Sequence, residues 1–123
     1  MRIEEIYRPE TLTCEAEDTV ADAARTMTSA HVGALAVLDG TMIIGVLSER
    51  DVVRAVAEGV DPATAHAETF ATRQVQTAQL AEESLEVARR MLDAGIRHLP
   101  VVQDRTVVGM TSMRDLLALE SWT

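Results

Sequence analysis

The chain has 123 residues, of which 47% are hydrophobic and 2% aromatic, and its formal charge is −9. This length suits one compact domain, and the composition provides a buried core of aliphatic side chains. The acidic balance and the scarcity of aromatic residues argue against a nucleic-acid partner, which needs a basic surface or stacking platforms.

No apolar run approaches the roughly 20 residues of a membrane-spanning helix, so we expect no membrane partner. The chain begins with acidic residues where a signal peptide is basic and then apolar, and we therefore expect a cytoplasmic protein. Cys14 is the only cysteine, which excludes an internal disulfide. A core position is the favoured interpretation of this cysteine, and a nucleophile is the alternative.

The first half of the chain predicts a helix, a two-stranded hairpin and a second helix. Apolar residues recur at helical spacing from Val20, and Thr19 is suited to cap this helix. The pair Asp39-Gly40 favours a tight turn between two apolar strands. In chain order, we predict an extended segment at 11–14, a helix at 19–31, strands at 34–40 and 42–47, and a helix at 48–59.

The second half repeats this pattern after a connector at 59–73, in which Pro62 marks a turn and a short helix is expected. The predicted elements are an extended segment at 75–78, a helix at 83–95, strands at 98–104 and 106–111, and a helix at 112–120. We place the first domain at 1–64 and the second at 65–123. A two-stranded β-β-α unit is too small to fold alone, so we expect the two repeats to bury their sheets against each other.

An offset of 64 residues brings the two halves into register, without a gap between Met27 and Asp51. The motif Gly-x-x-Ser-x-x-Asp stands in frame in both halves, as GVLSERD at 45–51 and as GMTSMRD at 109–115. Identical pairs at this offset include Thr13 and Thr77, Met27 and Met91, Gly45 and Gly109, Ser48 and Ser112, and Asp51 and Asp115. The chain is therefore a tandem repeat.

The repeated motif has a purely structural interpretation. Ser48 and Ser112 are suited to cap the helices that follow them, and an Asp three residues later completes a capping box at the positive end of the helix. Each motif glycine permits close packing of its strand. Caps of this kind stabilise a helix by about 1 kcal/mol in any protein.

The same groups also suit a ribose phosphate. A helix N-terminus offers N–H groups and a positive dipole to a phosphate, and a Ser hydroxyl there can donate to a phosphate oxygen. An Asp accepts hydrogen bonds from two ribose hydroxyls, as the acidic residue of dinucleotide-binding folds does. A Gly lets a ligand approach the backbone closely. The residues alone leave both interpretations open.

With the motifs GVLSERDVV and GIRHLPVV…VVGMTSMRDLL, the chain resembles a tandem pair of CBS domains, also called a Bateman module. The resemblance covers nearly the whole chain, and the connector resembles that of small stand-alone CBS-pair proteins. It implies an α/β (α+β) fold of two β-β-α-type units related by a pseudo-two-fold axis. There are departures from the family pattern. Ala36 stands where the family often has Pro, and Tyr7-Arg8-Pro9 and Ala71-Thr72-Arg73 occupy segments that commonly begin with Met-Thr.

For CBS pairs, the resemblance implies an adenosine nucleotide such as AMP, ADP or ATP in a cleft between the repeats, with Asp on the ribose and Ser or Thr on phosphate. The polar anchors carried over are Ser48, Asp51, Ser112 and Asp115, and Thr13 and Thr77 are weaker candidates. The adenine is expected on the aliphatic residues Val32, Leu35, Ile96 and Leu99. The candidates to neutralise phosphate are Arg50, Arg97, His98 and Arg114, with solvated surface charge as the alternative for each. The second motif is the favoured end, because more basic residues stand near it in the sequence.

The function implied by the resemblance is that of a non-enzymatic regulatory module that requires no cofactor and forms a homodimer. Ligand binding would shift the geometry between halves or subunits, and an unknown effector protein would respond. The alternative is a CBS-fold homodimeric interaction protein that binds no nucleotide. The histidines are dispersed, which predicts no metal site, and neither motif serine has an adjacent base for catalysis. Helix residues expected at the dimer interface, or else buried within one chain, are Val52, Val53, Val56, Leu116, Leu117 and Leu119, with Trp122 as an additional contact.

Overall fold

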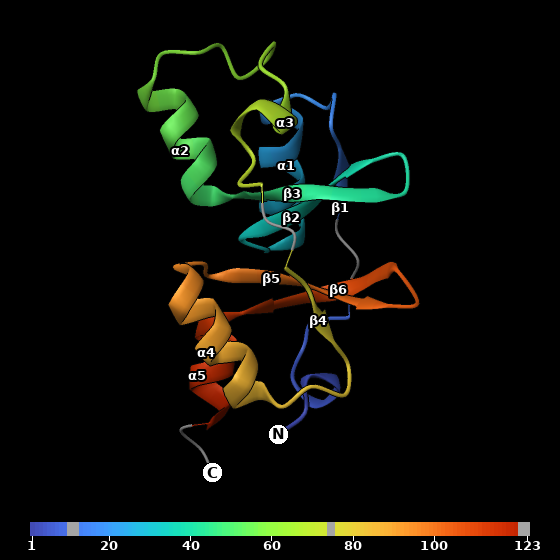
Figure 1. The fold of residues 1–123 in the computed structure, drawn as a ribbon. Helices are drawn as coiled ribbons and strands as arrows, with labels where there is room; N and C mark the ends of the chain where they lie inside the picture. Colours follow the sequence, from blue (N-terminus) through green and yellow to red (C-terminus); the bar gives the residue numbers. More distant parts are fainter. Residues whose placement is uncertain (10–12, 74–75, 121–123) are drawn as a thin grey trace. The chain divides into compact units, whose positions relative to one another are not determined.

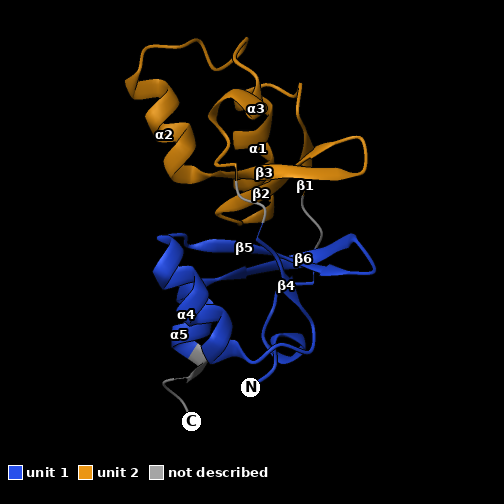
Figure 2. Ribbon diagram, viewed as in Figure 1, with its two compact units in different colours: residues 1–11, 76–123 blue, residues 12–75 orange. Residues whose placement is uncertain are grey.

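The computed structural model of the chain describes residues 1–9, 13–73 and 76–120, the side chains of 119 and 120 excepted. It divides into two compact units, which Figure 2 colours separately. Unit 1 combines residues 1–11 with 76–123, and unit 2 consists of residues 12–75. Each unit contains one three-stranded sheet with helices packed on it (Figure 1), which confirms the predicted mixed α/β class.

The sheet of unit 2 has the order β1 (Thr13–Glu15), β2 (Ala34–Asp39) and β3 (Met42–Ser48). β1 runs parallel to β2, and β2 pairs antiparallel with β3 across the predicted hairpin. Gly40 has a φ of +63°, so the turn uses the left-handed conformation that glycine adopts without strain. The helices are α1 (Val20–Ala30), α2 (Glu49–Ala57) and α3 (Ala67–Phe70), and they lie on one side of this sheet in Figure 1.

Unit 1 repeats this topology with β4 (Ala78–Gln79), β5 (His98–Gln103) and β6 (Thr106–Ser112). Its helices are the short 3-10 helix η1 (Ile3–Glu5), α4 (Ser84–Ala94) and α5 (Met113–Glu120), and α4 lies beside α5 (Figure 1). The strand register shifts at Val37/Leu38 in one sheet and at Val101/Val102 in the other. These positions are equivalent in the repeat, so the repeat extends even to the irregularities of the sheets.

Helix α1 forms as its sequence predicts. The hydroxyl of Thr19 accepts a hydrogen bond from the N–H of Asp22 at 3.1 Å, which caps the helix. Val20, Ala23 and Met27 bury one face of the helix, as their spacing indicates. The helix therefore owes its position to burial of this face in the core of unit 2.

Cys14 belongs to that core, together with residues of α1, β2 and α3. Burial, with a further contribution from the nearby carboxylates of Asp18 and Glu15, raises the pKa of the Cys14 thiol to about 11. Because only the thiolate is a strong nucleophile, the thiol is unreactive at neutral pH. The core interpretation of this cysteine is confirmed.

The compact units differ from the domains predicted at 1–64 and 65–123, because the first residues of each repeat pack with the other repeat. Ile3 and Ile6 lie in the core of unit 1, and the N–H of Ile3 donates to the carbonyl of Glu82 at 2.9 Å. At the equivalent positions, Ala67 and Phe70 lie in the core of unit 2. The boundaries of the sequence repeats and of the compact units thus differ by one short segment. Apolar residues at the start of each repeat complete the core of the unit that contains the rest of the other repeat.

Candidate functional site

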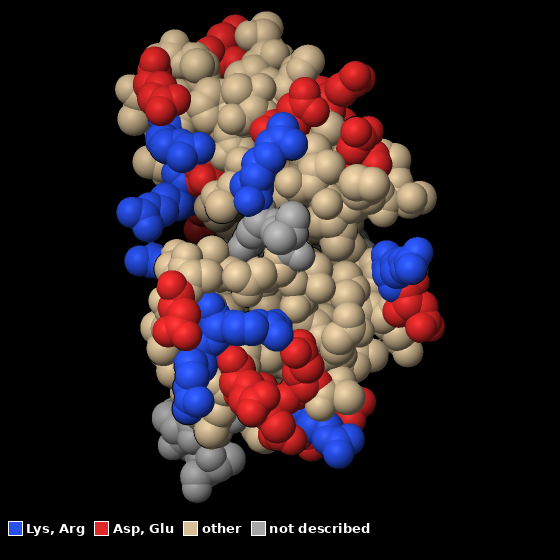
Figure 3. All heavy atoms as spheres, viewed as in Figure 1, with Lys and Arg blue, Asp and Glu red and all other residues tan. Residues whose placement is uncertain are grey.

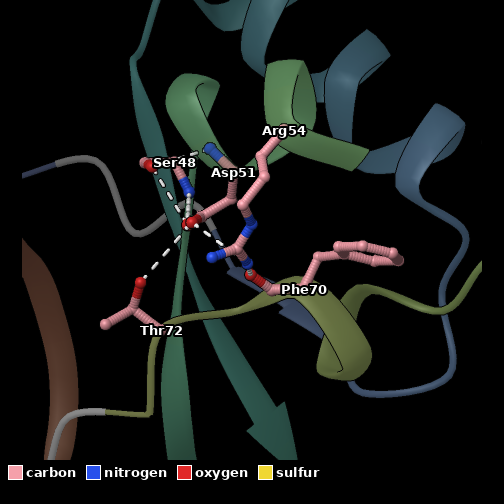
Figure 4. Close-up of polar contacts among 5 residues, drawn as sticks. All are labelled: Ser48, Asp51, Arg54, Phe70 and Thr72. Carbon is pink, nitrogen blue, oxygen red and sulfur yellow. Dashed lines mark hydrogen bonds and ion pairs between the residues drawn. The ribbon is translucent and has the colours of Figure 1, made fainter. Parts of the chain in front are cut away.

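The first Gly-x-x-Ser-x-x-Asp motif forms a capping box between β3 and α2 (Figure 4). Ser48 ends the strand and caps the helix, and its hydroxyl oxygen accepts from the N–H of Asp51 at 3.2 Å. In return, the N–H and the hydroxyl of Ser48 donate to Oδ2 of Asp51 at 2.9 and 3.0 Å. The structural interpretation of this motif is therefore confirmed.

The second carboxylate oxygen of Asp51 has longer contacts. The Thr72 hydroxyl donates to Oδ1 at 3.5 Å, and a guanidinium nitrogen of Arg54 lies 3.7 Å from the same atom (Figure 4). Arg54 makes its shorter bond, at 2.9 Å, to the carbonyl of Phe70. Asp51 is only 7% exposed. Its Oδ1 thus lies at the helix entrance with capacity for a closer hydrogen bond.

The second motif repeats the cap, but its carboxylate has a closer cationic partner than Asp51 has. The Ser112 hydroxyl accepts from the N–H of Asp115 at 3.1 Å. Arg8 donates to the two oxygens of Asp115 from Nε at 2.9 Å and from Nη2 at 3.5 Å. Partial burial by itself raises the pKa of Asp115, but the hydrogen bond and charge of Arg8 outweigh burial and hold this pKa below its ordinary value. Asp115 is therefore an ionised carboxylate in an ion pair.

The motif glycines permit the close approach of another chain segment. A Cβ atom on Gly45 would lie 2.6 Å from the carbonyl oxygen of Thr72, and one on Gly109 would overlap the backbone of Arg8. These segments bridge to β3 and β6 by paired backbone hydrogen bonds of 2.9 to 3.1 Å. Of the two interpretations of the glycines, the structure supports close packing of the chain.

The four aliphatic residues predicted to contact adenine fall into two classes. Val32 and Ile96 are half-buried and pack at the margins of the two cores. Leu35 and Leu99 are fully buried at 0% exposure, inside the cores of their own units. Both side chains therefore offer no exposed surface in this structure, and we do not carry Leu35 and Leu99 into the proposed adenine contacts. Alternation along β2 and β5 does not reveal this burial, since both strands are apolar on both faces.

Two of the remaining candidates lie beside the second motif. His98 pairs with Ser112 across the sheet, and the carbonyl of Arg97 accepts from the first N–H of α5 at 2.8 Å. Thr13 instead begins β1, where it pairs with Ala36 on the far side of β2 from the motif strand. Thr77 precedes β4, and its carbonyl accepts from Arg90 at 2.8 Å. The structure thus groups Arg97 and His98 with the second motif and places the two threonines one strand further away.

Arg8 and Thr72 were missed as functional candidates by sequence reasoning. They are equivalent at the offset of 64 residues, and each contacts the motif aspartate of its unit. The available signal was their position in the two segments that depart from the Met-Thr pattern. Nothing in the local sequence predicts the contact itself, because Arg8 and Asp115 are 107 residues apart.

Outside the two motifs, the described residues offer no comparable candidate for a binding site. Within 1–9, 13–73 and 76–120, no three His, Cys, Asp or Glu side chains are grouped as metal ligands, and no helix of these segments has the length and apolarity to span a membrane. Acidic and basic side chains alternate over α4 (Figure 3), where a shallow depression is lined by Glu86, Arg89, Arg90 and Asp93. Such a balanced, charged surface lacks the apolar lining of a typical ligand pocket.

Comparison with known proteins gives a consistent match. The family model of the CBS domain matches residues 3–58 and again 67–121. The mitochondrial CBS domain-containing protein CBSX3 of Arabidopsis thaliana is 31% identical over 112 residues, which are 86% of this chain and 54% of that protein. Hypoxic response protein 1 of Mycobacterium tuberculosis is 30% identical over 108 residues, 85% of this chain and 76% of that protein. The chain spans 42% to 62% of the length of four of the curated relatives that it matches.

A solved structure extends this match to the fold. It is the CBS domain pair of protein MJ0100 in complex with 5′-methylthioadenosine and S-adenosyl-L-methionine, which is 25% identical and matches with a TM-score of 0.87. The match covers 99% of this chain and 97% of that one. CBS domains are in general regulatory rather than catalytic. The two family matches, the repeated sheet topology and the repeated capping motif lead to one conclusion: this chain belongs to the CBS-domain family, as a tandem pair of CBS domains.

Proposed function

We propose that the chain is a non-enzymatic regulatory module that binds an adenosine nucleotide at one or both of its Ser-x-x-Asp helix entrances. Binding is proposed to act through a conformational or dimer change that an effector protein detects. The observation that carries the proposal is Asp51, an aspartate at a helix entrance whose Oδ1 has only long contacts. The two adenosine compounds named for the MJ0100 pair support the same ligand class.

The proposed roles follow the chemistry of each group. Asp51 and Asp115 accept hydrogen bonds from ribose hydroxyls, because a carboxylate is an acceptor with two oxygens. Ser112 donates to phosphate at the positive end of α5, and Ser48 does so at the positive end of α2 once its hydroxyl turns away from Oδ2 of Asp51. The remaining proposed contacts are Val32 and Ile96 to adenine, Arg97 and His98 to phosphate, and Thr13 and Thr77 as weaker polar contacts.

A homodimer through the helices is part of the proposal. Val53 and Val56 of α2 are 67% and 59% exposed, and Leu117 of α5 is 56% exposed. Leu116 is fully buried in the core of unit 1 and Val52 is half-buried against the core of unit 2, so these two do not contribute a free apolar surface. The Leu119 side chain and Trp122 lie outside the described residues.

The alternative function is an interaction protein of the same fold without a nucleotide. It is favoured by the internal contacts of the motifs, because Ser48 and Asp51 satisfy each other and Asp115 is paired with Arg8. Under this alternative, the motifs act as helix caps alone. Binding experiments separate the two functions directly.

The test is a thermal-shift and calorimetric series with AMP, ADP, ATP, S-adenosylmethionine and NAD. At a ligand concentration about 100 times Kd, binding is expected to stabilise the protein by about 2.7 kcal/mol. Asp51→Asn or Asp115→Asn is expected to weaken binding about tenfold or more, because a charged hydrogen bond contributes about 1.5 to 3 kcal/mol.

Asp22→Asn is the matched control. Asp22 follows the Thr19 cap at the same helix position, but it is exposed and lies outside the motifs, so its replacement should leave binding unchanged. Absence of binding of every adenosine compound to the folded wild-type protein contradicts the proposal and leaves the interaction protein.

A further inference from the structure

Arg8 and Thr72 give the two helix entrances different chemistry on the same backbone. The N–H of Arg8 donates to the carbonyl of Met110 at 2.9 Å, and Arg8 accepts from Met110 at 3.1 Å. Thr72 makes the same pair of bonds with Val46, both at 2.9 Å. Because these bridges fix the two backbones alike, the difference between the entrances lies in the side chains.

The side chain of Arg8 places a cation at the Asp115 entrance. Its guanidinium contacts both oxygens of Asp115, while 60% of the side chain stays exposed to solvent. Thr72, by contrast, offers Asp51 only a neutral hydroxyl at 3.5 Å. A solute that approaches Asp115 therefore meets a guanidinium bonded to the carboxylate. At Asp51 the nearest guanidinium, that of Arg54, lies 3.7 Å from Oδ1 and makes its shorter bond to the carbonyl of Phe70.

The neighbouring charges add to this difference. Among the described residues, the Arg8 guanidinium bonds to Asp115, the charge of Arg114 acts on the same carboxylate, and the carbonyl of Arg97 bonds to the first N–H of α5. The first turn of α2 carries Glu49 and Asp51, and Arg50 and Arg54 balance them. Met113 occupies the position in α5 that Glu49 has in α2. The first turn of α5 thus carries one acidic residue where the first turn of α2 carries two, so the Asp115 entrance is the less acidic of the two.

We propose that Arg8 is a specificity-determining residue that makes the Asp115 entrance prefer adenosine ligands with a phosphate over those without one. This inference rests on the adenosine binding proposed above. A ribose alone competes with Arg8 for the carboxylate, whereas a phosphate provides the guanidinium with an anionic partner in its place. At the Asp51 entrance this competition is weaker, because Arg54 lies 3.7 Å from the carboxylate and makes its shorter bond to the carbonyl of Phe70, so this entrance accepts uncharged adenosine compounds.

The experiment compares AMP with 5′-methylthioadenosine by calorimetry, because the two share adenosine and differ in the phosphate. Both ligands are measured on the full chain with the substitution Asp51→Asn, so that binding at the Asp115 entrance dominates. We expect AMP to bind about tenfold tighter than 5′-methylthioadenosine. Arg8→Thr should remove this preference, by weakening AMP about tenfold while leaving 5′-methylthioadenosine equal or tighter. In the reverse design, Thr72→Arg in an Asp115→Asn chain should create the preference at the other entrance.

Two further variants keep the outcome decisive. Arg89→Thr removes an exposed arginine of α4 in the same unit, with the same change of net charge, and should leave the preference intact. Arg8→Lys retains the positive charge and should keep part of the preference for AMP. This variant distinguishes loss of the charge from misfolding as the cause of an effect in Arg8→Thr.

The inference and the proposed function fail in different ways. If wild-type protein binds neither ligand, the proposed function fails. If wild-type protein binds but the Asp51→Asn chain binds nothing, or if Arg8→Thr changes both affinities equally or not at all, the role of Arg8 is overturned and adenosine binding stands.

Discussion

Asp51 and Asp115 end the same Gly-x-x-Ser-x-x-Asp motif but differ in their partners. Each caps a helix through the serine three residues before it. Asp51 is buried beside Thr72 with Arg54 at 3.7 Å, while Asp115 is more exposed and bonds to Arg8 at 2.9 Å. The backbone N–H of each aspartate is bonded to the capping serine, and at Asp51 the capping box uses Oδ2 but leaves Oδ1 with only longer contacts. One residue can therefore stabilise the helix and serve a binding site.

The Arg8–Asp115 ion pair predicts a pH-dependent stability. Arg8→Met should cost about 0.5 to 1 kcal/mol near neutral pH, a modest value because both side chains are partly solvated. The folded-state pKa of Asp115 is lowered, so this stabilisation is fully present above the ordinary pKa and is lost as the pH falls through the folded pKa. Urea denaturation of both proteins at several pH values between about 7 and 2.5 measures the difference.

The control for this prediction is Arg89→Met, which replaces an exposed arginine of α4 and should lower the free energy of unfolding by less. A stability difference between wild type and Arg8→Met that stays constant into strong acid would show that Arg8 stabilises the fold without the Asp115 charge.

At the scale of elements, β3 and β6 each carry a glycine where another segment crosses the strand. The segment around Thr72 bridges to Val46, and the one around Arg8 bridges to Met110. In both places the nearest atom to a Cβ would be a backbone carbonyl oxygen, which cannot turn away as a side chain can. The glycines are therefore required by how these segments pack, whatever the ligand.

Gly109→Ala is expected to destabilise the protein by about 1 to 3 kcal/mol or more, because the added methyl group forces the Arg8 backbone away from β6. Chemical denaturation measures this loss. Thr106→Ala, at an exposed position of the same strand, is the control and should change stability by about 0.5 kcal/mol or less. Equal stability of Gly109→Ala and wild type would mean that the segment at Arg8 does not pack against β6 as closely as described.

At the scale of the whole molecule, the first segment of each sequence repeat packs in the compact unit formed by the other repeat. Ile3 is fully buried in unit 1, and the backbone around it bonds to Glu82, Leu80 and Ser84. A chain whose first residues complete the core of its last repeat cannot finish unit 1 until nearly all of the sequence is available. The long sequence separation of these contacts also predicts slower folding than the small size alone suggests.

Ile3→Ala should therefore destabilise unit 1 by about 2 to 5 kcal/mol through the cavity it leaves. Native-state hydrogen exchange should show that Ile3→Ala accelerates amide exchange, relative to wild type, more at 1–9 and 76–120 than at 13–73. Leu92→Ala, at a side chain that is 68% exposed in α4, is the control and should have little effect. Faster exchange confined to 13–73 would contradict the assignment of Ile3 to unit 1.

The tandem repeat, the hairpins, the capped helices and the CBS resemblance could all be predicted from the amino-acid sequence. These features depend on local periodicity, turn residues and short motifs, which are legible within a few residues. The burial of Leu35 and Leu99, the packing of each repeat's first segment with the other repeat, and the contact of Arg8 with Asp115 became apparent only in the folded chain. Those facts depend on which distant segments the folded chain brings together, and a local pattern carries no record of a contact between residues more than a hundred positions apart.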